Sequence, residues 1–551
     1  MLRNITRLVT TRYDLVVVGG GIYGACAAWE GALRGLRVAL LEAGDFGGAT
    51  SSNSLRTLHG GLRHLQRLDL KRMRESVRER REWLRLAPHL ARPLRFILPT
   101  HGQGLRGPLL MRTALCVNDL LSADRNRGVR EDRRLPRGTL LSEPAARAAL
   151  AGLELEGCNG AAAWHDAVCS NTERLLLSVI TAAADAGAHV VNYVRATGLL
   201  AHRSRIRGVH ARDELSGREI ELRARFVINA AGPWVEDWLP AGAGRPDAPM
   251  FRASRAFNLL TRPLPFPDGV GLTVKAHGHD TTYFILPWNG HSLIGTRHLR
   301  CDPGTRSSDV MREEVLAFVS DLNTVLGSHR LTGNDVRGVF SGLLPEEEEH
   351  SGTEVALERD PQLIDHEPAG LRGLVSVVGV KWTIAPAVAA QAVRIACRQL
   401  GGDETRRRPR KLAPMTSAFF AGPRAIPPLD RALLAHLEQC YGAAHRHVLT
   451  LVTAEPALAT QVVPDLPVIL AQVAYAARAE MAVRLADVVM RRTPLYLSLA
   501  LDRQALTACA ATLARELRWS SKETGAQADE AARQLAAFRG PLVCDLEPAA
   551  A

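Results

Sequence analysis

Residues 13–24 read Y-D-L-V-V-V-G-G-G-I-Y-G, and this stretch decides the fold. Its apolar run at residues 13–18 is typical of a strand buried on both faces of a parallel sheet. The glycines lead into a helical pattern, A-C-A-A-W-E-G-A-L-R-G, and then into a second buried strand, V-A-L-L-E, which ends at Glu42. Strand, helix and strand in this order form a βαβ unit. The sequence therefore predicts an α/β fold with a doubly wound sheet.

Three glycines in this stretch, Gly19, Gly21 and Gly24, have the G-x-G-x-x-G spacing of a dinucleotide-binding turn. The first permits the tight turn, the second lets a pyrophosphate approach the backbone, and the third lets helix and strand pack closely. The phosphates would lie at the helix amino terminus, where Ile22 begins the helix. Glu42 follows Gly24 by 18 residues. Its carboxylate can bind an adenosine ribose and disfavours NADP, although a chance surface glutamate is the alternative.

Three further segments favour FAD over NAD. An NAD-dependent enzyme needs little after Glu42, whereas this chain continues with small and hydroxylated residues, E-A-G-D-F-G-G-A-T-S-S-N-S. Two later predicted strands are followed by A-A-G-P-W at residues 230–234 and by G-V-K-W-T at residues 379–383. Such turns suit a longer ligand that lies across the sheet. The residues expected to contact FAD are Gly19, Gly21, Ile22, Gly24, Glu42, Thr50, Ser51, Ser52, Ala231, Gly232, Lys381, Trp382 and Thr383.

The composition narrows the class of protein. The 551 residues, 46 % of them hydrophobic and 23 % charged, are typical of a globular chain of two to four domains. The net charge of +12 is mild at this length, and 5 % aromatic residues are too few for base stacking, so no nucleic-acid binding is expected. Nine cysteines without a C-x-x-C pair predict neither a disulfide framework nor a metal site. Neither a signal peptide nor a membrane span is evident, so a cytoplasmic location is expected.

The later strands predict that two domains are interleaved along the chain. Residues 226–229 and 374–378 look like further strands of the first sheet, whereas residues 94–99 and 282–288 are short alternating strands bounded by Gly and Pro. Residues 473–492 lack Gly and Pro and predict one long helix. The predicted division is an FAD-binding domain (residues 12–78, 160–235 and 350–402), a mostly antiparallel substrate-binding domain (residues 79–159 and 236–349) and a helical carboxy-terminal domain (residues 412–540). Residues 406–411, R-R-R-P-R-K, are expected to form a solvated linker, and a membrane-surface or anion contact is the alternative.

Together these motifs resemble the FAD-dependent, aerobic-type glycerol-3-phosphate dehydrogenases, and they occur in that family's order. The resemblance rests on Y-D-L-V-V-V-G-G-G-I-Y-G-A, E-A-G-D-F, A-T-S-S-N-S, H-G-G-L-R-H-L, A-P-H-L-A-R-P-L-R-F-I-L-P, N-A-A-G-P-W-V, I-L-P-W-N-G-H-S-L-I-G-T, G-V-K-W-T and, in the tail, Y-A-A-R-A-E-M-A. It implies a Rossmann-like FAD domain of the glutathione-reductase and D-amino-acid-oxidase type. It also implies oxidation of sn-glycerol 3-phosphate to dihydroxyacetone phosphate, with electrons passed to a quinone-type acceptor.

The resemblance also implies that the segment from Thr50 to Leu65 starts against the flavin and ends in the substrate pocket. His59, Arg63 and Lys381 are the expected catalytic residues. A near-neutral imidazole suits the removal of a hydroxyl proton, and the fixed fork of an arginine suits a phosphate. The alternatives are a core or capping role for His59 and a surface cation for Lys381.

The chain departs from the family pattern at several substrate positions. Leu344, in S-G-L-L-P, stands where the family has a phosphate-gripping arginine, and Phe257 stands where it has a histidine. His64, Arg297 and His298 also depart from the pattern and are expected to bind substrate. A lost charge-assisted bond costs about 1.5–3 kcal/mol. Either another cation such as Arg297 compensates, or the substrate is another small hydroxy or amino compound, or the chain is a non-catalytic FAD-binding partner protein.

Residues 109–121, L-L-M-R-T-A-L-C-V-N-D-L-L, predict an apolar helix flanked by Arg106, Arg125 and Arg127. The run is too short to span a bilayer, but such a helix can lie in the interface. Peripheral association with the inner face of a membrane is therefore an expectation, and a packed domain helix is the alternative. The sequence leaves a homodimer open.

Overall fold

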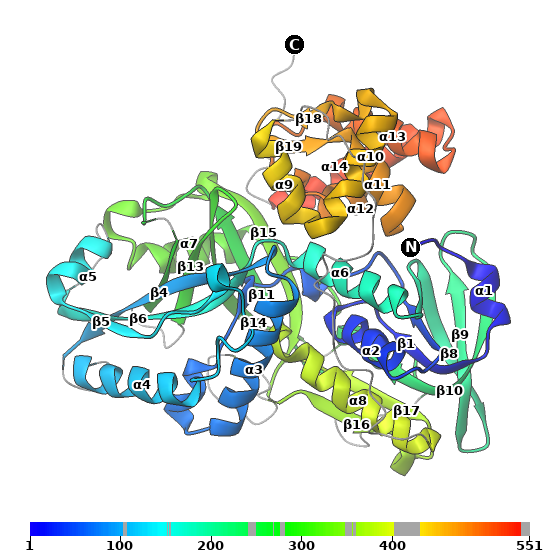
Figure 1. Cartoon of the computed structure of the whole chain (residues 1–551), viewed down its shortest axis with the longest axis horizontal. Coiled ribbons are helices and arrows are strands. Elements are labelled where there is room, and N and C mark those ends of the chain that lie inside the picture. The colour runs from blue at the N-terminus through cyan, green and yellow to red at the C-terminus, as the bar shows by residue number, and fades with distance from the viewer. Residues whose placement is uncertain are drawn as a thin grey trace.

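The computed structural model describes residues 1–102, 107–150, 153, 156–240, 250–267, 269–275, 282–302, 304–347, 355, 360–401 and 430–540. They form two β-sheets that lie side by side, each with helices packed on it, and a helical carboxy-terminal domain, drawn in orange to red, that contacts both parts (Figure 1). The predicted linker at residues 406–411 lies outside the described residues. No helix in the described part of the chain combines the length and apolarity needed to cross a bilayer.

The first sheet is built around β1 (Tyr13–Val18), whose central side chains are fully buried. Its strands in spatial order are β16 (Gln362–Asp365), β17 (Leu374–Val378), β10 (Glu219–Asn229), β1, β2 (Val38–Leu41) and β7 (His189–Val191), with the hairpin of β8 (Val194–His202) and β9 (Arg205–Asp213) joined to β10. The pairs β1–β10, β1–β2, β2–β7 and β10–β17 are parallel. The predicted parallel sheet, with β10 and β17 as members, is confirmed.

Both faces of this sheet are covered, which explains its continuous apolar strands. The helices on one face are α2 (Ile22–Leu33), α6 (Thr172–Asp185) and α8 (Ala385–Leu400). Leu15 and Leu40 point into that helical layer, whereas Val16 and Leu41 point to the opposite face, where the β8–β9 hairpin and α1 (Ile5–Thr10) pack. The predicted α/β fold is confirmed.

The second sheet has nine strands and is antiparallel except for the β12–β4 pair. Its strands in spatial order are β15 (Val336–Pro345), β11 (Ala253–Thr261), β14 (His291–Arg300), β13 (Thr282–Trp288), β12 (Val270–Lys275), β4 (Ala91–His101), β6 (Cys158–Cys169) and β3 (Thr57–Leu58), with β5 (Thr139–Leu141) beside β6. Its neighbouring helices are α3 (Leu70–Leu86), α4 (Pro108–Leu121), α5 (Glu143–Ala149) and α7 (Arg312–Asn323). Most of β6 falls in a segment assigned above to the FAD-binding domain, so the exact domain boundaries stay a prediction.

The carboxy-terminal domain packs on one end of the second sheet. Its elements are α9 (Arg431–Tyr441), α10 (His445–Ala454), β18 (Gln461–Val463), β19 (Leu466–Ile469), α11 (Leu470–Glu480), α12 (Leu485–Asp487), the π-turn η11 (Val488–Arg492), α13 (Arg503–Leu517) and α14 (Ser521–Arg539). The ring of Phe340 on β15 lies 6.2 Å from that of Tyr496 and 5.0 Å from that of Phe538. This aromatic cluster joins the helical domain to β15.

The prediction of one long helix over residues 473–492 is wrong. Helix α11 ends at Glu480, Met481 adopts a φ of +53°, and the chain then forms α12 and η11. Side chains from other segments bind the backbone where the helix ends. Asn192 donates to the Met481 carbonyl, and Arg492 donates to the Glu480 carbonyl. The break depends on these tertiary contacts, and no Gly or Pro marks it.

Candidate active site

The glycine turn after β1 leaves no room for side chains. Gly19 has a φ of +103°, and a Cβ there would lie 2.4 Å from the Ala230 carbonyl oxygen. A Cβ on Gly24 would lie 1.8 Å from the carbonyl oxygen of Gly19. Gly21 caps the amino terminus of α2 without a side chain. Such a close approach of β1, β10 and the start of α2 is the backbone geometry that a dinucleotide-binding turn requires, and it suits the pyrophosphate of FAD at the helix amino terminus.

Glu42 lies at the end of β2, next to the turn. Its carboxylate accepts hydrogen bonds from the Gly20 amide at 2.6 Å and from the Gly44 amide at 2.8 Å. Burial raises the pKa of Glu42, although these two hydrogen bonds oppose the shift. The carboxylate is therefore fixed at the position where the predicted ribose contact is needed.

The three hydroxylated residues at positions 50–52 form a 3₁₀ turn against α2. Ser51 Oγ accepts a hydrogen bond from the Ile22 amide at 3.0 Å, which places this hydroxyl at the amino terminus of α2. Thr50 donates to the Leu343 carbonyl at 3.1 Å, and Ser52 donates to the Gly47 carbonyl. The turn thus joins the dinucleotide loop to β15 of the second sheet.

The segment after β17 closes the same region. The hydroxyl of Tyr23 on α2 donates to the Lys381 carbonyl at 2.8 Å, and Trp382 Nε1 donates to the Ser51 carbonyl at 3.3 Å. Thr383 Oγ1 accepts from the His59 amide at 3.2 Å. Near β10, Ala231 and Gly232 form the predicted small turn, and a Cβ on Gly232 would meet no atom within 4 Å. The residues predicted to bind FAD therefore surround the amino terminus of α2.

His59 pairs with a carboxylate that the sequence did not single out. Its Nδ1 lies 3.4 Å from Oδ2 of Asp166 on β6, while the Gly60 amide donates to Asp166 Oδ1 at 2.7 Å. Arg80 on α3 forms an ion pair with the same carboxylate. Burial alone would raise the pKa of Asp166, but Arg80 and His59 outweigh it and hold that pKa below its usual value. Asp166 is therefore ionised and orients the imidazole, whose ring also lies 5.5 Å from that of Phe284.

Lys381 and His64 meet on the other side of this segment. Lys381 Nζ lies 2.9 Å from His64 Nε2. Burial lowers the pKa of Lys381, and the charges of Arg72 and Arg63 lower it further. Arg63 itself is exposed in η2 (Leu62–Arg67). These three predicted residues therefore form one cationic group.

The two predicted residues on β14 separate, because neighbouring residues of a strand face opposite sides. His298 is half-buried with its Nδ1 shielded from solvent, and this burial followed by the charge of Arg63 lowers its pKa to about 4. Arg297 instead forms an ion pair with Asp321 on α7 and lies 5.8 Å above the ring of Phe318. The structure brings His298 towards Arg63 and leaves Arg297 on the α7 side.

Phe257 on β11 and Leu344 on β15, which both differ from the family pattern, also lie on different faces of the second sheet. Phe257 is fully buried against Phe318, with ring centroids 5.6 Å apart. Leu344 is half-buried and lies two residues beyond Gly342, where a Cβ would be 3.1 Å from Thr50. Leu344 therefore shares the face of the second sheet against which the turn at residues 50–52 lies.

Several buried polar atoms on the second sheet have no hydrogen-bond partner within the described part of the chain. They include Trp164 Nε1, Ser254 Oγ, Thr273 Oγ1 and His298 Nδ1. Trp164 stacks on Phe96, and Thr273 is the cross-strand neighbour of Phe284, whose ring contacts His59. Unpartnered buried polar atoms next to such a histidine suit the binding of a polar ligand. No local motif marks Asp166, Trp164 or Thr273, so sequence reasoning missed them.

Known proteins match this chain along most of its length. Residues 14–395 match the family model described as FAD dependent oxidoreductase, and residues 390–524 match the C-terminal domain of alpha-glycerophosphate oxidase. A glycerol-3-phosphate dehydrogenase of Synechocystis sp. is 33 % identical over 513 residues, which cover 89 % of this chain and 90 % of that protein. A mitochondrial glycerol-3-phosphate dehydrogenase of Mus musculus is 26 % identical over 558 residues, which cover 96 % of this chain and 73 % of that protein.

The fold is also that of a solved flavoprotein. The structure of the glycerol-3-phosphate dehydrogenase from Bacillus halodurans complexed with FAD superposes with a TM-score of 0.74 at 22 % identity, covering 98 % of this chain and 97 % of that chain. In this chain the glycine turn, Glu42 and the turn at residues 50–52 lie together at the start of α2. Since the family model and the Synechocystis relative each span most of the sequence, this chain belongs to the FAD-dependent glycerol-3-phosphate dehydrogenase family and is an FAD-dependent oxidoreductase.

Proposed function

We propose that this protein oxidises sn-glycerol 3-phosphate to dihydroxyacetone phosphate and passes the electrons to a quinone. The observation that carries the proposal is the pair of His59 and Asp166. His59 lies on the segment that runs from the turn at residues 50–52 to the cationic group of Arg63, His64 and Lys381, and Asp166 lies beside it on β6. The names of the relatives support the substrate.

His59 takes the proton of the substrate hydroxyl in this proposal. Its imidazole is half-exposed, so a substrate can reach Nε2, while Nδ1 faces the ionised Asp166. A carboxylate at Nδ1 holds the ring in the tautomer that leaves Nε2 free to accept a proton, and it stabilises the resulting imidazolium. FAD, when bound, accepts the hydride from the carbinol carbon.

The phosphate would be held mainly by Arg63, with Lys381 and His64 beside it. Arg297 is a poor candidate for this role, because its guanidinium is committed to Asp321 on the α7 side. Leu344 supplies no charge. We therefore expect the phosphate to be bound by fewer cations than the family pattern provides, with a correspondingly higher Michaelis constant.

Two alternatives follow from the departures at Leu344 and Phe257. The enzyme could oxidise another small hydroxy or amino compound, or it could bind FAD without turnover as a partner protein. The pairing of His59 with Asp166 favours turnover, because a non-catalytic protein needs no oriented base.

The identity of the substrate can be tested by anaerobic bleaching of the flavin absorbance with a panel of polyol phosphates, hydroxy acids and amines. Bleaching by glycerol 3-phosphate supports the proposal, and bleaching only by another compound identifies that compound's class instead.

For the acceptor, we infer that the protein associates peripherally with the inner face of a membrane. On α4 the side chains of Leu109 and Leu120 are 81 % and 76 % exposed, and Leu68 at the end of η2 is 84 % exposed. Helix α4 packs beside η2, so these apolar side chains lie close to the segment that carries Arg63 and His64. A quinone in the bilayer would then be near the flavin. The cytoplasmic location and a homodimer remain predictions.

A further inference from the structure

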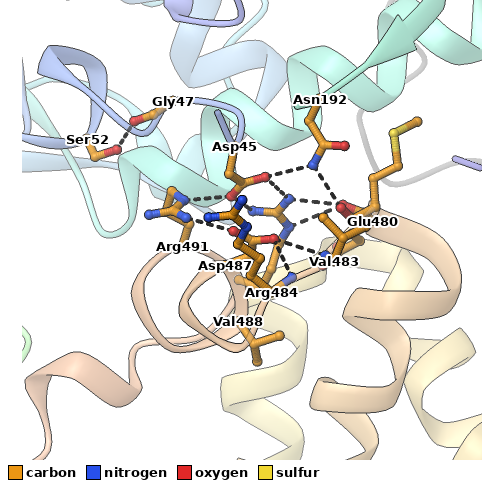
Figure 2. A network of polar contacts seen from close by, with 12 residues as sticks. Asp45, Gly47, Ser52, Asn192, Glu480, Val483, Arg484, Asp487, Val488 and Arg491 are labelled. Carbon is orange, nitrogen blue, oxygen red and sulfur yellow. Dashed lines mark hydrogen bonds and ion pairs between the residues drawn. The ribbon is translucent and has the colours of Figure 1, made fainter. Parts of the chain in front are cut away.

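The loop that follows Glu42, residues 43–47, is held in place by side chains of the carboxy-terminal domain that bind Asp45 (Figure 2). Asp45 is buried, and its carboxylate accepts two hydrogen bonds of 2.7 Å from the guanidinium of Arg492. Arg491 Nε donates to the same carboxylate at 2.6 Å. Both arginines belong to η11, more than 440 residues further along the chain. Asp45 is thus a fully paired anion held by two cations of another domain.

A second buried carboxylate continues this network. Asp487 accepts from Arg491 Nη2 at 2.9 Å and from the Tyr193 hydroxyl at 2.6 Å. It also accepts from the amides of Val483 and Arg484, both at 2.9 Å. Arg491 therefore bridges Asp45 and Asp487, and the irregular backbone between α11 and α12 is fixed by the same group.

The corner between β7 and β8 ties this network to the ribose-binding loop. Asn192 donates to Asp45 Oδ1 at 3.1 Å and to the Met481 carbonyl at 2.9 Å. The Tyr193 amide donates to the Gly44 carbonyl at 2.9 Å, and the Val194 amide donates to the Glu42 carbonyl at 2.7 Å. These hydrogen bonds hold the loop at Glu42, Gly44 and Asp45, all within three residues of the Glu42 carboxylate.

The loop also touches the phosphate-binding turn. The Gly47 amide donates to the Gly20 carbonyl at 3.1 Å, and the Gly20 amide donates to Glu42 at 2.6 Å. A shift of Asp45 would therefore move the residues expected to hold the ribose and the pyrophosphate. Removing one partner of a buried ion pair leaves the other charge unpaired, so such a shift is the expected response to a change in η11.

We propose that Asp45 is a positioning residue for FAD and that the segment from Met481 to Arg492 of the carboxy-terminal domain forms part of the cofactor-retaining structure. Docking of this segment and binding of FAD then stabilise one another. Because such a coupling is reciprocal, FAD must also stabilise the segment from Met481 to Arg492.

The test measures release of FAD from the full-length holoprotein on dilution, followed by the rise in flavin fluorescence. For Asp45→Asn and Arg491→Gln we expect the dissociation constant for FAD to rise about five- to a hundredfold, the usual range of coupling between sites. Arg491→Lys keeps a cation beside Asp45 and should recover part of the affinity. The matched control is Glu480→Gln, which removes a buried ion pair with Arg174 on α6 across the same domain contact but keeps the backbone carbonyl that accepts from Arg492.

Two outcomes would overturn the proposal. Unchanged FAD affinity in Asp45→Asn and Arg491→Gln, with only a lower melting temperature, would make the network purely structural. Equal loss of FAD from Glu480→Gln would assign the effect to general weakening of the domain contact. Hydrogen exchange gives the reciprocal readout: excess FAD should slow exchange at residues 481–492 in the wild type and do so less in Arg491→Gln. None of these measurements depends on the substrate, so they stand apart from the catalytic assays.

Discussion

Lys381 Nζ lies 2.9 Å from His64 Nε2, and this contact joins the segment after β17 to the segment that follows β3. An ammonium group only donates hydrogen bonds, so Nε2 of His64 is the acceptor when Lys381 is charged. Lys381 and His64 therefore lie together, and Arg63 is close enough for its charge to lower the pKa of Lys381.

Lys381→Met should raise the Michaelis constant for glycerol 3-phosphate about tenfold or more, because one charge-assisted bond to the phosphate is lost. His64→Tyr provides a hydroxyl that can still accept from Lys381, and it should change this constant little. Steady-state kinetics on protein of equal FAD content compares the two. If Lys381→Met matches the wild type, Lys381 does not contact the phosphate.

His59→Gln should lower kcat by about 10²–10⁴-fold, because the base for the hydroxyl proton is removed. The FAD content and the flavin spectrum should be retained, since the His59 side chain contacts Asp166 and Phe284 and only its amide contacts Thr383. Stopped-flow flavin reduction measures the loss directly. A rate of reduction equal to that of the wild type would remove His59 from the mechanism.

Leu344→Arg distinguishes the substrate hypotheses by the sign of its effect. If glycerol 3-phosphate is the substrate, the added guanidinium should lower its Michaelis constant about tenfold while kcat changes little. If the substrate lacks a phosphate, the same change places an unpaired cation against it and should reduce turnover. Leu344→Met is the volume-matched control. No flavin reduction by glycerol 3-phosphate in any of the three proteins would end the first hypothesis.

His298 should make the fold less stable at acidic pH. Its pKa is lowered from 6.5 to about 4, so between these values the unfolded chain binds a proton that the folded chain does not. The free energy of unfolding should therefore fall as the pH drops from 6.5 to 4, by at most about 3 kcal/mol from this group. Urea unfolding of wild type and His298→Gln across this range should show a shallower loss in the variant.

His436 provides the matched control for that measurement, because burial also lowers its pKa to about 4 but it lies on α9 of the carboxy-terminal domain. His436→Gln should flatten the pH dependence similarly while leaving the Michaelis constant unchanged. His298→Gln should alter both. An unchanged Michaelis constant in His298→Gln would place His298 outside the substrate site.

Leu109→Glu and Leu120→Glu together should reduce co-sedimentation with anionic vesicles at low salt, because two exposed apolar side chains become charged. Leu499→Glu is the control, since Leu499 is 61 % exposed but belongs to the carboxy-terminal domain. If the wild type itself does not co-sediment, the peripheral membrane proposal fails.

The sequence predicted the β1–α2–β2 unit and its glycine turn well because their determinants are local. An apolar strand and glycines that cannot carry a Cβ determine the turn, whatever the rest of the chain does. Arg297 and His298 show a different case. Strand alternation implies that adjacent residues cannot both face one ligand, and the structure separates them accordingly.

Asp166 and Asp45 could not be found in the sequence for a physical reason. Each is defined by partners on remote segments, Asp166 by Arg80 and His59, and Asp45 by Arg491 and Arg492. Remote side chains also break the helix that residues 473–492 were expected to form, because Asn192 and Arg492 bind the backbone carbonyls of Met481 and Glu480. Helical periodicity records which side chains are apolar, but it does not record which distant groups will bind the backbone.

The order of strands in the first sheet has a consequence for synthesis on the ribosome. Strand β1 begins at Tyr13, its partner β10 begins at Glu219, and β17, which completes the parallel pairs, ends at Val378. About 360 residues must therefore be translated after β1 before all the parallel partners of the first sheet are present, as these positions show. Such non-local pairing slows folding and leaves strand edges exposed meanwhile. We expect fragments that end before β17 to aggregate or to need chaperones. For the same reason, the amino-terminal half alone should not form a flavin-binding unit.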